Sequence, residues 1–126
     1  MSNRILISFL FCFLCFHLAS EPKIKFLIDY AYIGEVKETD RNILLPVRYT
    51  NVGNSPLYLD EIKSNCPCLR SEFSTEGLEP GDTAMFTLIF NPLHVGDVYQ
   101  SVRIYHNSDT EERAYETFKV IGKVCE

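Results

Sequence analysis

The amino-acid sequence predicts an all-β protein, either an antiparallel sandwich or a small barrel of six or seven short strands. Apolar residues alternate with polar residues in several segments, turn formers recur about every ten residues, and no segment has a helical period. The chain has 126 residues, enough for one domain. It has no tryptophan and no widely spaced cysteine pair of the antibody type, so an antibody-like domain is not indicated.

Alternation of apolar and polar residues locates the individual strands. They are expected at residues 23–32, 43–50, 57–60, 83–90, 98–105 and 114–124, with a short edge strand at 69–73. In the first strand, one face is expected to carry Ile24, Phe26, Ile28, Tyr30 and Tyr32. Residues 33–36 are expected to leave this strand for a polar loop. Pro46 removes a backbone donor from the second strand, which predicts an edge position or a bulge.

Two segments have the composition of tight turns. Asn51 to Pro56 is dense in turn formers, and Gly53 or Asn54 can take a positive φ there. Residues 79–82, with the sequence Glu-Pro-Gly-Asp, place proline and glycine where a type II turn needs them.

Residues 1–20 have the composition of a secretory signal peptide, which would leave residues 21–126 as the domain. Arg4 precedes an apolar run that extends from Ile5 to Phe16, and the small residues Ala19 and Ser20 suit a signal peptidase. The run is shorter than the ~20 residues that span a bilayer, and a retained membrane anchor and a buried core helix are the alternatives. Export predicts a periplasmic or extracellular location, where thiols meet oxidising conditions.

The charge of the chain excludes two classes of partner. The formal net charge is −5, and the sequence has no stripe of clustered Lys and Arg. Nucleic acids and anionic membrane surfaces are both bound through such basic clusters. We therefore expect neither a nucleic-acid partner nor electrostatic binding to a membrane surface. Cleavage of the signal peptide would also leave no membrane span.

A series of short motifs occurs in an order that is typical of one bacterial family. The motifs are Ile33-Gly34-Glu35-Val36, Tyr49-Thr50-Asn51-Val52-Gly53, Pro56-Leu57, Ser64-Asn65-Cys66-Pro67-Cys68, Leu78-Glu79-Pro80-Gly81-Asp82, Phe90, Gly96-Asp97-Val98-Tyr99, Asn107 and Ile121-Gly122-Lys123-Val124. In this order they resemble the family catalogued as domain of unknown function 1573, over about Phe26 to Val124. The family usually has Cys-Gly-Cys followed by Thr, whereas this chain has Pro67 and Leu69 at those positions.

This resemblance implies a fold and a location but no activity. It implies an immunoglobulin-like antiparallel β-sandwich of about seven strands, similar to modules of cilia and centrosome proteins and to the major sperm protein fold. It also implies a secreted or lipid-anchored protein of a Gram-negative bacterium. In an immunoglobulin-like sheet, the strand before Cys66 and the last strand run parallel with one strand between them, so that Cys125 would lie at the same pole as Cys66 and Cys68.

The cysteines are the sharpest chemical feature of the chain. Signal cleavage would leave Cys66, Cys68 and Cys125, and an odd number of thiols cannot all pair within one chain. A disulfide or inert buried thiols are expected, the disulfide joining Cys125 to one of the others or Cys66 directly to Cys68. The alternative is a copper, zinc or redox site at Cys66 and Cys68. The further ligands available to such a metal site are Cys125, His94, His106 and Met85.

The other polar clusters predict no catalytic site. Acidic residues gather near Asn107, at Asp109, Glu111, Glu112 and Glu116, where a solvated turn explains them better than a cation site does. His94 and His106 are expected at the surface, since no nucleophile lies in a recognisable frame beside them. Seven tyrosines, several of them on predicted outer faces, could form an interaction surface: Tyr30, Tyr32, Tyr49, Tyr58, Tyr99, Tyr105 and Tyr115.

The sequence thus predicts an exported, non-enzymatic binding or structural module of the bacterial cell envelope, with protein partners and no cofactor. Binding would use either strand addition at an open sheet edge or the tyrosine-bearing face. The alternative is a thiol-based copper- or zinc-binding or redox protein built on Cys66 and Cys68. Neither the partner nor the oligomeric state follows from the sequence.

Overall fold

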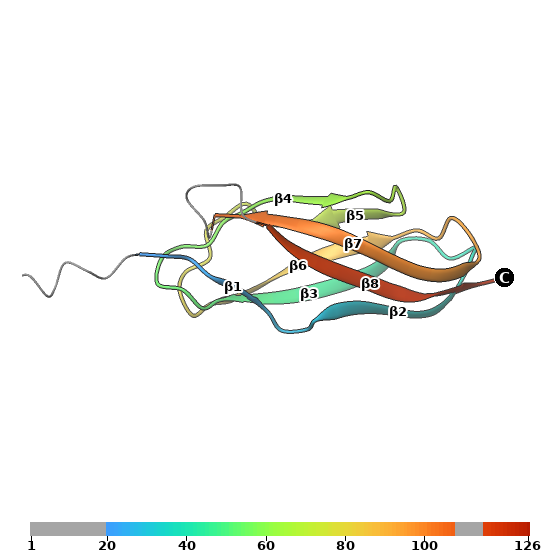
Figure 1. Cartoon of the computed structure of the whole chain (residues 1–126), viewed down its shortest axis with the longest axis horizontal. Helices are drawn as coiled ribbons and strands as arrows, with labels where there is room; N and C mark the ends of the chain where they lie inside the picture. The colour runs from blue at the N-terminus through green and yellow to red at the C-terminus, as the bar shows by residue number, and fades with distance from the viewer. Residues whose placement is uncertain (1–19, 108–114) are drawn as a thin grey trace, which may run out of the picture.

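The computed structural model describes residues 20–107 and 115–126, and within them the chain forms eight strands and no helix (Figure 1). The strands are β1 (Ile24–Phe26), β2 (Tyr30–Lys37), β3 (Ile43–Asn51), β4 (Leu59–Ser64), β5 (Leu69–Glu72), β6 (Thr83–Phe90), β7 (Gly96–His106) and β8 (Tyr115–Cys125). A helix able to cross a membrane is therefore not found in these residues. The predicted signal peptide lies outside the described residues, except for Ser20.

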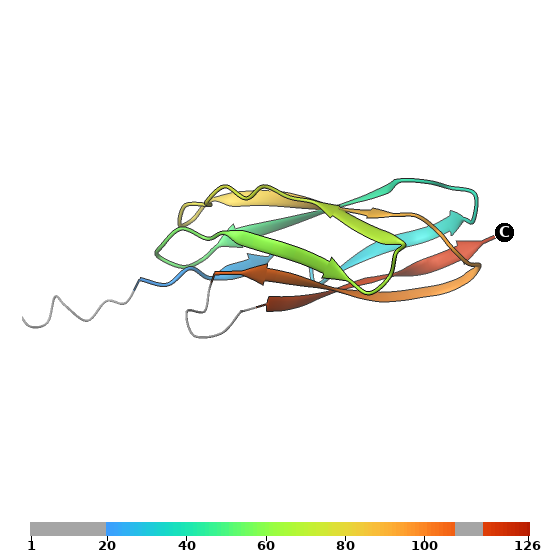
Figure 2. The same ribbon diagram turned by 90° about the horizontal axis from the view of Figure 1, so that it is seen from above.

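The strands form two four-stranded sheets that pack face to face (Figure 2). Sheet A has the order β1-β3-β6-β5 and is antiparallel throughout. Sheet B has the order β2-β8-β7-β4, in which only β2 and β8 run parallel. The predicted immunoglobulin-like sandwich is confirmed. In sheet B, β7 separates β4 from β8, so these two strands end at the same pole as expected.

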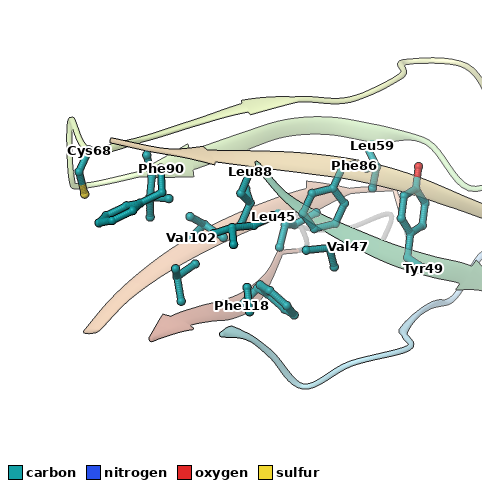
Figure 3. Close-up of a cluster of buried hydrophobic side chains, with 14 of the residues drawn as sticks. Leu45, Val47, Tyr49, Leu59, Cys68, Phe86, Leu88, Phe90, Val102 and Phe118 are labelled. Atoms are coloured by element: carbon teal, nitrogen blue, oxygen red, sulfur yellow. The ribbon is translucent and has the colours of Figure 1, made fainter. Parts of the chain in front are cut away.

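The side chains between the sheets form one continuous core (Figure 3). Phe86 of β6 and Phe118 of β8 face each other across the sandwich, with ring centroids 6.3 Å apart. Phe26 of β1 contacts both rings, at 6.2 Å and 5.4 Å. Strands β3 and β6 bury the residues that alternation predicted, since Leu45, Val47, Tyr49, Phe86, Leu88 and Phe90 are all buried.

The predicted first strand is wrong in one respect, because it is two strands in different sheets. β1 ends at Phe26 in sheet A, and β2 begins at Tyr30 in sheet B. After the crossing, the residues that face the core are the ones predicted to face outward: Ala31 is 4% exposed, whereas Tyr32 is 67% exposed. The break expected at residues 33–36 is wrong too, since β2 continues to Lys37 through an irregularity at Gly34, whose φ is 81°. The polar loop expected at residues 37–41 follows directly, since residues 38–42 are not in a strand.

Pro46 lies at a local sheet edge, as predicted. Arg48 O accepts a hydrogen bond from Leu27 N, so the alternate residues 46 and 48 direct their backbone groups toward the β1 side. β1 pairs only with residues 49–51 of β3, and no strand of the described chain lies beside Pro46 on that side. Sheet A therefore loses no backbone hydrogen bond at Pro46, although proline has no N–H to donate.

Asn51, at the end of β3, holds three separate segments together. Its side chain is fully buried, and its Oδ1 accepts hydrogen bonds from Gly53 N at 2.9 Å and Lys23 N at 3.3 Å. Its Nδ2 donates to Ser55 O at 2.7 Å and to Leu78 O at 2.9 Å. All four hydrogen-bonding positions of the amide are used.

Gly53 is needed for a close backbone approach. Neither it nor Asn54 has the positive φ that the sequence allowed for. A Cβ at Gly53 would collide with Glu21 O and would lie 2.6 Å from Lys23 N. Glycine therefore lets the chain before β1 lie directly against the turn that follows β3. The turn at residues 79–82 is confirmed as type II, with Asp82 N bonded to Glu79 O and Gly81 at φ 86°.

Replacing Asn51 by alanine tests this network. The variant leaves several buried backbone groups without their partner, and each such group costs about 1–3 kcal/mol. We expect Asn51→Ala to lower the free energy of unfolding by about 3 kcal/mol, measured by urea denaturation. Asn65→Ala, at an exposed position, is the control and should change it by less than about 0.5 kcal/mol. Equal losses in the two variants would contradict the proposed role of Asn51.

Candidate functional site

The outer face of sheet B gathers five of the seven tyrosines. The cross-strand register places Tyr32, Ile121 and Tyr99 in one row across β2, β8 and β7, and Tyr30 beside Lys119 in the next row. Tyr115 lies opposite Tyr105, with ring centroids 5.4 Å apart. We call this surface the tyrosine face, and it consists of Tyr30, Tyr32, Tyr99, Arg103, Tyr105, Tyr115, Lys119 and Ile121. Tyr99 is 64% exposed, so aromatic surface here is open to solvent.

Two cations lie over the aromatic rings of the tyrosine face. Lys119 Nζ is 5.4 Å from the ring centroid of Tyr99, and the Arg103 guanidinium carbon is 5.0 Å from that of Tyr115. A hydrogen bond with Tyr105, together with the neighbouring phenols, raises the pKa of Arg103, which stays charged. Beside these residues a hollow of about 430 Å³ is lined by Lys63, Asn65, Ser101, Arg103, Tyr105 and Thr117. This surface can therefore bind acidic groups.

The remaining tyrosines lie elsewhere. Tyr49 is a core residue, and burial raises its pKa. Tyr58 lies on the turn before β4, where its ring covers Gly77. Alternation within single strands identified outward-facing residues in β7 and β8. The inclusion of Tyr30 and Tyr32 depends on the crossing between sheets, which the sequence did not indicate.

The structure joins Cys66 directly to Cys68 in a disulfide across Pro67, with Cα atoms 5.1 Å apart. The direct bridge is one of the three pairings that the sequence left open. The two pairings with Cys125 are not formed, since Cys125 is a free, half-buried thiol in β8. Cys68 is 4% exposed and belongs to the core, whereas Cys66 is half-buried. Cys68 N donates a hydrogen bond to Cys66 Sγ at 3.2 Å.

The surroundings of this disulfide differ from a metal site. A pocket of about 110 Å³ beside it is lined by Cys66, Cys68, Phe90, Leu93, His94, Asp97, Val98, Gln100 and Val124. His94 is thus near the cysteines, but Met85 is exposed on sheet A and His106 lies at the opposite end of β7. Among residues 20–107 and 115–126, three or more His, Cys, Asp or Glu side chains do not gather where they could hold a metal ion.

His106 is buried, and its expected surface position is wrong. The last residue of β7 points into the sandwich, so that its ring is enclosed and only 6% of the residue is exposed. Burial lowers the pKa of His106, and Glu116, whose Oε1 lies 3.6 Å from Nε2, opposes this shift. His94 is exposed. The other acids of the predicted cluster, Asp109, Glu111 and Glu112, lie outside the described residues.

Comparison with known families identifies the chain. A profile of the family of proteins of unknown function DUF1573 matches residues 24–124. The chain belongs to this family. The resemblance found in the sequence motifs is therefore confirmed. A search of curated proteins found no match.

Solved structures similar to this DUF1573 chain share its fold at low sequence identity. A protein of unknown function from Porphyromonas gingivalis W83 is 14% identical, with a TM-score of 0.68 over 85% of this chain and 50% of that one. The chain thus spans about half the length of that protein. PapD-like domain 7 of human CEP192 is 13% identical, with a TM-score of 0.67 over 87% of this chain and 94% of the domain. WR4, a major sperm protein family member of C. elegans, is 14% identical, with a TM-score of 0.51 over 85% of this chain and all of WR4.

The buried histidine predicts loss of stability in acid. The pKa of His106 is below 6.5 in the folded protein, so the unfolded chain binds a proton more readily in the window below that value. We expect the free energy of unfolding to fall between about pH 7 and about pH 5, and His106→Gln to make this slope shallower. Urea denaturation across this range measures the slope. His94→Gln, at an exposed position, should leave the slope unchanged, and equal slopes for His106→Gln and the parent protein would refute the assignment.

Proposed function

We propose that this protein is an exported, non-enzymatic binding module of the bacterial cell envelope, and that the tyrosine face binds an acidic segment of a partner protein. The apolar segment at residues 5–16 supports export to the periplasm or cell exterior. The observation that carries the binding function is the group of exposed tyrosines on one sheet face, with Arg103 and Lys119 between them. Tyrosine and arginine are enriched at protein interfaces and at their energetic centres.

The charge around the tyrosine face supports an acidic partner. The chain carries a net charge of −5, yet Arg103 and Lys119, which lie over rings of this face, are both basic. Lys63 adds a third positive charge at the hollow beside them. Three acids border these cations. Glu61 lies opposite Tyr105 and is paired to Lys63 at 3.8 Å, and Glu35 and Asp97 lie on either side of Lys123. An acidic segment would thus be attracted to this face and repelled by the acidic remainder of the surface.

The sheet edges favour this face over strand addition. The outer strands of sheet A are short, since β1 has three residues and β5 has four. The outer strands of sheet B, β2 and β4, each contain an irregularity in their pairing. Short and bulged edges hinder the addition of a further strand, because a new strand needs a regular row of free N–H and C=O groups. Each of the four edge strands in the described part of the chain is thus either short or irregularly paired.

Photo-crosslinking in the producing bacterium tests the proposed binding face. A photoreactive amino acid at position 99 should give a cross-link to a specific protein partner. Met85, on the outer face of sheet A and also half exposed, is the matched position and should give no such product. The charge reversals Arg103→Glu and Lys119→Glu together should lower the yield at position 99 at least about tenfold, because like charges would then face each other.

The opposite pattern would reject the tyrosine face. Stronger cross-linking at position 85 would move the interface to sheet A. A yield at position 99 that is insensitive to the two charge reversals would exclude an acidic partner segment. Circular dichroism of each variant should show the parent spectrum, since Met85, Tyr99, Arg103 and Lys119 are all exposed.

A further inference from the structure

The disulfide between Cys66 and Cys68 contributes little to holding the fold together. Disulfides stabilise mainly by restricting the unfolded chain, and this restriction grows with the length of the loop that they close. Here only Pro67 lies between the two cysteines, so the disulfide closes a very short loop and restricts little of the unfolded chain. Both cysteines lie in the loop between β4 and β5. The bridge therefore adds no covalent connection between the two sheets beyond the loop itself.

The two sulfur atoms differ in accessibility and in surroundings. Cys68 is buried among core residues, and Cys66 is half-buried, so a reagent from solvent reaches the Cys66 sulfur first. Cys68 N donates its hydrogen bond to Cys66 Sγ at 3.2 Å. A backbone donor at this position favours the charged form of a thiol, as helix amino termini do in other proteins with reactive cysteines.

Local hydrogen bonds hold both cysteines in place, largely independently of the disulfide. Cys66 N donates to Ser64 Oγ at 3.1 Å, and Cys66 O accepts from Leu69 N at 3.1 Å. Cys68 O accepts from Asn91 N at 2.8 Å. The adjoining pocket of about 110 Å³ offers Phe90, Leu93 and Val98 as apolar lining. A partner can therefore place an apolar side chain in this pocket while one of its cysteines approaches Cys66.

We propose that the Cys66–Cys68 disulfide exchanges with the dithiol of an exported partner protein. A thiolate of the partner attacks Cys66 Sγ, the Cys66–Cys68 bond breaks, and its electron pair goes to Cys68 Sγ, which takes up a proton. The second partner thiolate attacks the partner sulfur of the mixed disulfide, and Cys66 leaves as a thiolate beside Cys68 N. The partner dithiol becomes a disulfide, and its two electrons reduce the Cys66–Cys68 bond, leaving Cys68 as a thiol and Cys66 as a thiolate that takes up a proton from solvent.

This exchange goes beyond the binding function proposed above and does not require turnover. One molecule oxidises one partner dithiol, so the reaction is stoichiometric. The Tyr99 cross-link involves neither cysteine, so each proposal can fail without the other.

A trapping experiment tests the exchange in the whole protein. A reduced synthetic peptide with two cysteines separated by two residues should become oxidised while Cys66 and Cys68 become alkylatable. A peptide with only one of these cysteines should stop at the mixed disulfide, which site-resolved mass spectrometry should locate on Cys66 at least about tenfold more often than on Cys68. A mixed disulfide mainly on Cys68 or Cys125, or a peptide that stays reduced, would overturn the proposal.

Single-cysteine variants provide the matched comparison, with Cys125→Ser present in both. Cys68→Ser leaves the accessible thiol, and Cys66→Ser leaves the buried one. We expect the thiol of Cys68→Ser to react with a small aromatic disulfide at least about tenfold faster than that of Cys66→Ser. Equal rates would contradict the assigned roles, and so would copper or zinc bound to reduced cysteines in the purified protein. If either variant fails to fold, the trapping experiment on the unaltered cysteines decides alone.

Discussion

The hydrogen bonds of one buried amide connect segments that are distant in the chain. Asn51 bonds to Lys23 before β1, to Gly53 and Ser55 in its own turn, and to Leu78 before β6. Burying an amide without partners is costly, whereas a fully bonded amide fixes the relative positions of its partners. The backbone of Asn51 adds bonds to Gly81 and Asp82, so one residue positions both neighbours of β3 at this pole.

The chain leaves the segment anchored by Asn51 through β1 and then enters sheet B as β2. Lys23 O accepts from Val52 N at 2.8 Å, which anchors the start of β1 beside the end of β3. From there the chain crosses to sheet B within residues 27–29, and β2 begins with Ala31 directed inward. Side chains alternate with a period of two, so a shift by one residue would bury Tyr30 and Tyr32. The composition of the tyrosine face therefore depends on the register of β2 against β8, in which Tyr30 lies opposite Lys119 and Tyr32 opposite Ile121.

The sequence predicted the fold and several core residues, because their signals are local. The inward residues of β3 and β6 follow from alternation alone, and the turn at residues 79–82 follows from the positions of Pro80 and Gly81. The crossing after Phe26 was missed because Leu27 and Ile28 are apolar and continue the pattern of a strand. The burial of His106 was missed because its position in β7 is at a strand end, where polarity usually indicates exposure. The tyrosine face required cross-strand register, which one sequence does not contain.

Within the described residues, the two candidate sites share β7, β8 and the end of β4, and these elements have one arrangement. The tyrosine face rests mainly on β7 and β8, which pair over ten consecutive residues. Cys66 and Cys68 lie in the loop after β4, which leads away from sheet B to the edge of sheet A. Coupling between two sites needs an element with two arrangements that both sites influence. The long β7–β8 ladder has one register, and the cysteines are held by local hydrogen bonds. A change in the disulfide should therefore leave the tyrosine face as it is, which makes binding and thiol exchange separable properties of one small domain.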